Sequence, residues 1–291
     1  MNERLRWIRN NLKSQNIQGM IISNPINIRY LTNINAEGIL LLTLKENIYI
    51  TDDRYIEYVK RTLTIDDEII VTNVKDLSLE DYENYFMFCE NVGFEENYVT
   101  YAKYKEFMHK YKINALVETE GIIEKQRQIK DDEEISCIRK ACEITDNCFS
   151  HLLGYIKKGM TEKQVANEIE RFFKENGASG VSFDTIVASG RNSSVPHATP
   201  TDKKIESGDI ITIDMGCKYK GYCSDMTRTI FVDFVQDYMK NVYSLVLENQ
   251  MTALSKMKDG EIIKTISRIV ECNFKMHDCE LVHALRTWSR S

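Results

Sequence analysis

The sequence lacks several features that would direct it to a membrane, out of the cell or onto nucleic acid. Its charged first residues, Met1 to Trp7, contain no continuous apolar stretch of the kind that a secretory signal needs. The longest apolar run, Gly38 to Leu44 with Thr43 within it, is far shorter than the ~20 residues that cross a bilayer. A net charge of −6 leaves no basic excess for binding nucleic acid. We therefore expect a cytoplasmic protein with no membrane or nucleic-acid partner.

Paired cysteines are absent as well. The eight cysteines form no CxxC motif, so the sequence contains neither a zinc knuckle nor a redox motif of that type. Scattered cysteines in a cytoplasmic protein are typically reduced thiols that are buried or half buried. They lie at positions 89, 137, 142, 148, 217, 223, 272 and 279.

What is present is the composition of a globular protein that is long enough for two domains. The chain has 291 residues, of which 43% are apolar and 28% charged. Short strand patterns alternate with helical ones up to about residue 124, which predicts an α/β domain over residues 1–124. From Asp131 onward the helical patterns are longer, and Thr161 begins a capping box with Gln164. Residues 125–291 are therefore expected to form a second domain, of the α+β class.

Two aspartates lie on either side of a predicted hairpin. The β-rich runs Ile210 to Cys217 and Tyr222 to Val232 are separated by polar residues and a glycine. With Tyr219–Lys220 as the tip, Asp214 faces Asp225 directly, at ~4.5–5.5 Å between Cβ atoms. Two carboxylates at this separation repel each other unless a cation lies between them, and their oxygens suit divalent ions. The alternative is that each aspartate merely ends a strand or caps a turn.

The motifs around these aspartates resemble those of the pita-bread metallopeptidases, specifically proline dipeptidase and aminopeptidase P. Methionine aminopeptidases share that catalytic fold but lack the N-terminal domain, and creatinase has the domain without using the metal-ligand set. The combination found here therefore indicates an Xaa-Pro peptidase. The motifs are NIRYLT (residues 27–32), TDDRY (51–55), VGFEE (92–96), QIKDDEEISCIRKA (128–141) and, within residues 182–229, SFDTIVASGRNSSVPHATPTD, GDIITIDMG and GYCSDMTRT.

The resemblance implies a fold, a reaction and a set of site residues. The fold would be a creatinase-type α/β N-terminal domain followed by a pita-bread domain, and the reaction would be hydrolysis of peptides or dipeptides at Xaa-Pro bonds. Asp214 would bind one of two divalent ions, Mn²⁺ or Co²⁺, and Asp225 would bridge both. His197 would line the substrate site and hydrogen-bond the reacting carbonyl, although a lone histidine after proline is otherwise typical of a loop. A homodimer is the assembly that the family suggests.

The resemblance breaks near the end of the sequence. The family continues with His-x-x-Gly-His, whose second histidine is a metal ligand, and later supplies two glutamate ligands. Here His283 matches the first histidine and is a second catalytic candidate, whereas Thr287 stands where the ligand is expected and both glutamates are missing. One nucleotide inserted ahead of codons for Gly-His-Gly-Val-Gly-Leu would encode the observed Arg-Thr-Trp-Ser-Arg-Ser. A natural divergent terminus and a cloning scar are the alternatives to this frameshift.

Two functional interpretations follow from this break. The first is a C-terminally truncated Xaa-Pro metallopeptidase whose metal site is incomplete, so that the family's activity is expected to be missing from the chain as written. The second is a non-catalytic remnant, or a module that dimerises through its N-terminal domain. In either case we expect apolar surface of the second domain to be exposed, which lowers stability and favours aggregation.

Overall fold

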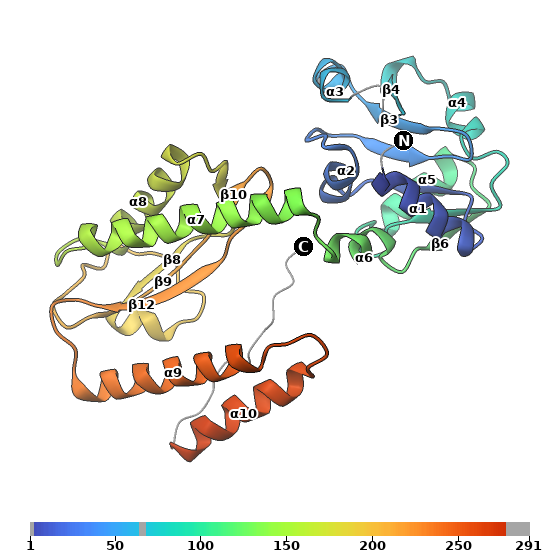
Figure 1. Ribbon diagram of the computed structural model, residues 1–291. Helices are drawn as coiled ribbons and strands as arrows, with labels where there is room; N and C mark the ends of the chain where they lie inside the picture. Colours follow the sequence, from blue (N-terminus) through green and yellow to red (C-terminus); the bar gives the residue numbers. More distant parts are fainter. Residues whose placement is uncertain (1–2, 64–67, 278–291) are drawn as a thin grey trace. The chain divides into compact units, whose positions relative to one another are not determined.

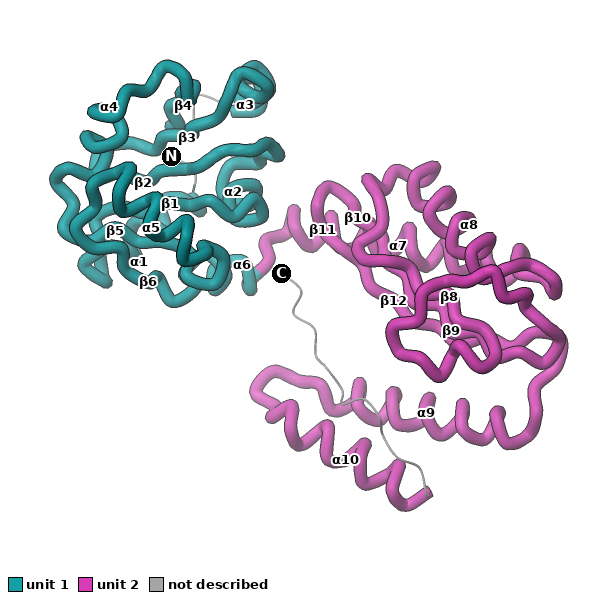
Figure 2. The backbone as a smooth tube through the Cα atoms, turned by 180° about the vertical axis from the view of Figure 1, so that it is seen from behind, with its two compact units in different colours: residues 1–129, 289–291 teal, residues 130–288 magenta. Residues whose placement is uncertain are grey.

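The computed structural model describes residues 3–63 and 68–277, which form two compact units (Figure 2). The first unit extends to Ile129 and the second begins at Lys130. Among the helices described in these ranges, none combines the length and the apolar character needed to cross a membrane.

The first unit is a six-stranded sheet with helices packed against it (Figure 1). The strand order is β4-β3-β2-β1-β5-β6, with β2 antiparallel to both β1 and β3 and the other neighbours parallel. The strands are β1 (Gly19–Ile22), β2 (Ile39–Leu42), β3 (Asn47–Thr51), β4 (Ile69–Asn73), β5 (Asn91–Phe94) and β6 (Ala115–Glu118). The helices are α1 (Glu3–Ser14), α2 (Pro25–Thr32), α3 (Ile56–Thr62), α4 (Leu79–Asn84), α5 (Tyr101–Lys110) and α6 (Ile122–Gln128), with a short 3-10 helix η2 (Val74–Asp76).

Both faces of this sheet are buried, which explains why its strands are continuous apolar runs. Met20 and Ile22 of β1 belong to one core cluster, whereas Ile21 between them belongs to another. Leu41 of β2 joins the cluster of Ile21. Because successive side chains of a strand point to opposite faces, a sheet covered on both sides needs apolar residues at every position.

We predict that residues 1–129 fold cooperatively without the rest of the chain and are more stable than residues 1–124. The longer piece keeps Arg127 of α6, which is 8% exposed and donates from Nη1 to Asn27 Oδ1 at 2.8 Å. Losing this charged, buried hydrogen bond is expected to cost about 2 kcal/mol. Urea unfolding of both pieces measures the difference. A broad, non-cooperative transition for residues 1–129 would contradict the prediction.

The second unit contains long helices and two small sheets. The sheets have the strand orders β12-β9-β8 and β11-β10-β7. The strands are β7 (Gly180–Val181), β8 (Ile186–Ser189), β9 (Ile210–Met215), β10 (Cys217–Tyr219), β11 (Tyr222–Cys223) and β12 (Met226–Phe231). The helices are α7 (Asp132–Tyr155), α8 (Glu162–Glu175), α9 (Asp237–Lys256) and α10 (Ile263–Met276), with a 3-10 helix η3 (Gly190–Ser194).

Reciprocal hydrogen bonds begin α7 and α8. Thr161 Oγ1 accepts from Gln164 N at 3.1 Å, and Gln164 Oε1 accepts from Thr161 N at 2.9 Å. Asp131 and Glu134 form the same arrangement at the start of α7. Both pairs satisfy backbone N–H groups that have no partner within the helix. The predicted capping box of Thr161 is confirmed.

One face of the β8–β9–β12 sheet packs against α7 and α8, and α9 lies on the other side (Figure 1). Ile211, Ile213 and Met215 of β9 are fully buried in a cluster with residues of α7 and α8. Burying each such side chain contributes about 1.5–3 kcal/mol. Thr212 and Asp214, which alternate with them, are partly exposed. The central strand therefore has a closed apolar face and an open polar one.

The hairpin between β9 and β12 turns at Lys220–Gly221, one position later than the predicted tip. Both turn residues have positive φ, 45° at Lys220 and 80° at Gly221. Two-residue turns of this kind match the right-handed twist of the strands, and glycine adopts the conformation without steric cost. As a result Asp214 pairs with Thr227. The prediction that Asp214 directly faces Asp225 is wrong, because it assumed a tip at Tyr219–Lys220 and so placed Gly221 in the strand instead of the turn.

Candidate active site

Asp214 lies on the open face of β9. Its neighbours Ile213 and Met215 are buried, so the alternation of the strand turns Asp214 to the opposite face. Thr227, its partner on β12, donates from Oγ1 to Asp214 Oδ1 at 2.8 Å. This bond orients the carboxylate. Thr227 was not among the predicted site residues, although it lies two residues after Asp225 within the same motif.

Asp225 is exposed and lies between β11 and β12. The strand pairs before and after Asp225 follow one register. Lys218 is opposite Cys223, and Met215 is opposite Met226. If this register continued through Ser224 and Asp225, which lie outside the strands, Asp225 would be the diagonal neighbour of Asp214 on the same face. Diagonal Cα atoms are ~7–8 Å apart and their Cβ atoms are somewhat closer, which is within reach of side chains that share a metal ion. The corrected register therefore puts Thr227 opposite Asp214 and leaves Asp225 two residues before that partner in the sequence.

Buried contacts fix the backbone immediately before Asp225. Ser224 is 4% exposed, and its N–H donates to Cys217 O at 2.9 Å. Its Oγ accepts from Cys217 N at 2.9 Å and lies 2.6 Å from Thr145 Oγ1 of α7. The opposite backbone at Gly216 comes so close that an added Cβ would lie 2.1 Å from Ser224 O. Asp225 is thus exposed at its side chain but anchored through its neighbour.

The two candidate catalytic histidines are placed differently. His197 lies on an exposed turn after η3, in the loop between β8 and β9, and so belongs to the same unit as both aspartates. His283 lies outside the described residues.

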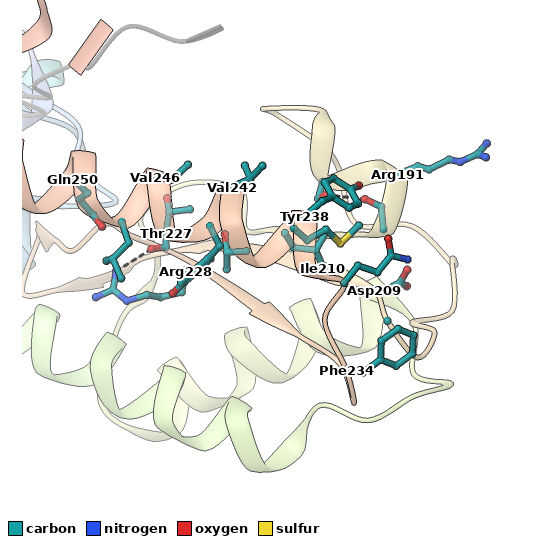
Figure 3. A pocket seen from close by; sticks show the side chains of 18 of the residues that line it. Arg191, Asp209, Ile210, Thr227, Arg228, Phe234, Tyr238, Val242, Val246 and Gln250 are labelled. Atoms are coloured by element: carbon teal, nitrogen blue, oxygen red, sulfur yellow. Dashed lines mark hydrogen bonds between the residues drawn. The ribbon is translucent and has the colours of Figure 1, made fainter. Parts of the chain in front are cut away.

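A cavity of about 1070 Å³ lies between the open face of the sheet and α9 (Figure 3). Ile210 and Thr227 line it from the strands, and Val242 and Val246 line it from the helix. Apolar walls with a few polar groups are typical of sites for small organic ligands. Thr227 connects this cavity to the aspartates, because it lines the cavity and donates to Asp214.

Asp214 and Asp225 fit a divalent cation by their chemistry but supply only part of a site. Carboxylate oxygens are ligands that Mn²⁺ and similar ions prefer. Within residues 3–63 and 68–277, no group of three or more His, Cys, Asp and Glu side chains is placed to hold a metal ion. Catalytic metals usually have three or more protein ligands. Among the described residues, these two carboxylates are therefore candidates for cation binding that lack a third clustered ligand.

Comparison with known proteins identifies the family. Residues 136–282 match metallopeptidase family M24, and residues 4–129 match the creatinase/prolidase N-terminal domain. The chain belongs to metallopeptidase family M24. The resemblance found in the motifs is thereby confirmed, and so is the predicted fold, a creatinase-type N-terminal domain followed by the pita-bread domain of M24.

Relatives of this M24 chain include named peptidases. An uncharacterized peptidase, YqhT, of Bacillus subtilis is 37% identical over 259 residues, which cover 88% of this chain and 73% of the relative. The Xaa-Pro dipeptidase of Pyrococcus horikoshii is 32% identical over 272 residues, covering 92% and 75%. Among solved structures, an Xaa-Pro dipeptidase from Bacillus anthracis superposes with a TM-score of 0.88 at 32% identity, covering 97% of this chain and 80% of its own.

Proposed function

We propose that this protein is an Xaa-Pro metallopeptidase that hydrolyses the peptide bond before proline in dipeptides or short peptides. The observation that carries the proposal is the register of the hairpin, in which Asp214 pairs with Thr227, two residues after Asp225 and on the wall of an apolar cavity. Membership of M24 and the names of its Xaa-Pro dipeptidase relatives support the choice of substrate. A cytoplasmic location remains part of this proposal.

Each candidate residue has a distinct role in this proposal. Two divalent ions, either Mn²⁺ or Co²⁺, would be bound by Asp214 and Asp225. The hydroxyl of Thr227 holds the carboxylate of Asp214 in place. Bound there, such ions would lower the pKa of a water molecule and polarise the substrate carbonyl. His197 would donate a hydrogen bond to the oxygen on which negative charge develops during attack. The cavity walls would exclude water from the side chains of the substrate.

The small number of candidate metal ligands among the described residues predicts a low activity for this chain. Two carboxylates hold and orient ions less well than three or more ligands do. We therefore propose that the chain binds divalent ions weakly and hydrolyses Xaa-Pro substrates much more slowly than a fully liganded M24 enzyme. The second candidate function is non-catalytic, in which the intact N-terminal unit forms a homodimer.

Metal counting and dipeptide cleavage test both candidates. We expect the purified chain, supplied with Mn²⁺, to bind fewer than two ions tightly and to cleave Ala-Pro at least about 100-fold more slowly than a longer Xaa-Pro dipeptidase. Pro-Ala serves as the control peptide. Cleavage of Ala-Pro at the rate of the longer enzyme would contradict the ligand argument. Complete absence of metal binding and cleavage, together with a dimer in sedimentation analysis, would favour the non-catalytic candidate.

A further inference from the structure

A buried carboxylate at the start of α8 contacts the loop that carries His197. Glu162 is 0% exposed although it is charged. Its Oε1 accepts from Ser189 N at 2.7 Å and from Ser189 Oγ at 2.8 Å. Ser189 is the last residue of β8, so these two bonds hold the beginning of the loop.

The other oxygen of the same carboxylate holds the end of the loop. Glu162 Oε2 accepts from Thr201 N at 3.0 Å and from Thr201 Oγ1 at 2.6 Å. Asn192 of η3, inside the loop, donates from Nδ2 to both carboxylate oxygens, at 3.0 Å and 3.1 Å. Six hydrogen bonds thus converge on one side chain, and His197 lies on the segment that they close.

The electrostatics of this carboxylate agree with the geometry. Burial by itself would raise the pKa of Glu162, but the hydrogen bonds from Thr201 and Ser189 outweigh it and keep the pKa below its ordinary value. The first turn of α8 also favours a negative charge through the helix dipole. Glu162 therefore stays ionised, and an ionised carboxylate accepts from backbone N–H groups more strongly than a neutral side chain does.

Capping of α8 does not account for Glu162. The N-cap of the helix is Thr161, and its reciprocal partner is Gln164. Glu168, farther along the same helix, is a second nearly buried carboxylate at 7% exposure. It contacts His151 and Arg171 instead of the loop. A variant of Glu162 therefore loses contacts to the loop, whereas a variant of Glu168 loses contacts of α8 that do not involve the loop.

We infer that Glu162 is a positioning residue, whose carboxylate joins Ser189 to Thr201 and so fixes the loop that presents His197. A carboxylate accepts at both oxygens, so one side chain can hold two separate segments of backbone, here at Ser189 and at Thr201. The consequence for substrate binding rests on the proposed function, because it requires that His197 contacts the substrate. The fixing of the loop itself does not depend on that role.

The variant Glu162→Gln tests the inference, with Glu168→Gln as the matched control. The amide keeps one acceptor oxygen, but its NH₂ group replaces the other oxygen and faces groups that also donate. A backbone N–H such as that of Thr201 can only donate, so this hydrogen bond is lost. In Glu162→Gln we expect amide hydrogen exchange in residues 190–201 to rise at least about tenfold, while α7 exchanges as before. We also expect the dissociation constant for Ala-Pro, followed through the ring signals of His197 in NMR, to rise at least about fivefold. Glu168→Gln is expected to lower the thermal midpoint and to leave both readouts unchanged.

Each alternative result has a definite meaning. Unchanged exchange in residues 190–201 of Glu162→Gln would overturn the inference, as would an equal rise in Glu168→Gln. If the exchange rises as expected but the wild-type His197 signals do not respond to Ala-Pro, then the fixing of the loop stands and the proposed substrate contact of His197 is wrong.

Discussion

Replacing Gly216 with alanine is expected to destabilise the second unit by about 3 kcal/mol and to displace the backbone next to Asp225. A Cβ at this position would lie 2.1 Å from Ser224 O and 2.3 Å from Ser182 Oγ. The hydroxyl of Ser182 can rotate away, but the carbonyl of Ser224 belongs to the backbone, so the two strands must move apart. Urea unfolding monitored by circular dichroism measures the loss, and Mn²⁺ titration shows whether the carboxylates remain aligned.

The control for this variant is Gly154→Ala in the last turn of α7. An added Cβ at Gly154 meets no atom within 4 Å. Alanine in a helix is favoured over glycine, so we expect stabilisation of about 0.5–1 kcal/mol. If Gly216→Ala unfolded at the same urea concentration as the wild type, then the close approach of the strands would not be a constraint on the hairpin.

The second large effect is expected on metal binding. Replacing Asp214 with asparagine removes the charge of one of the two carboxylates on the open face, and we expect Mn²⁺ affinity to fall about 100-fold. Stability is expected to change little, because the amide oxygen still accepts from Thr227. Asp202→Asn is the control, since Asp202 is an exposed partner of Lys163 in the same unit. Calorimetric titration of all three proteins measures the difference.

The variant Asp225→Asn should repeat this loss if the two carboxylates share the ions. A chain in which Asp225→Asn binds Mn²⁺ as the wild type does, while Asp214→Asn does not, would show that the carboxylates bind separately. Equal binding by both variants and the wild type would place the cation elsewhere and remove the main support for the proposed site.

Much of the fold follows from local sequence patterns. The acidic first turn after Asp131 and the capping box of Thr161 each mark the start of a helix, and both helices begin there. β8 was missed, because all four of its residues are buried and a short apolar run without alternation cannot be told from other buried segments. Its partner β9 was predicted because the β-rich run Ile210 to Cys217 precedes a turn, and the strand occupies the first part of that run.

The site was predictable only in part. The motif sequence singled out Asp214 and Asp225, but the choice of turn residues decided which side chain faces Asp214, and a one-position error replaced Thr227 with Asp225. Glu162 had no signal beyond its place after an N-cap. Its partners Ser189 and Thr201 are 27 and 39 residues away in the sequence, and hydrogen bonds over such separations leave no periodic pattern.

The two-residue turn at Lys220–Gly221 also constrains how the length of this segment can change during evolution. Because side chains alternate along a strand, one residue added at the tip would shift the pairing by one and send every side chain of β12 to the opposite face. Met226 would then take the place of Thr227 opposite Asp214. Two added residues would restore the face but part Thr227 from Asp214. Insertions and deletions at this tip therefore keep the outward side chains of β12 on the face of Asp214 only in even numbers, or where a β-bulge absorbs the odd residue.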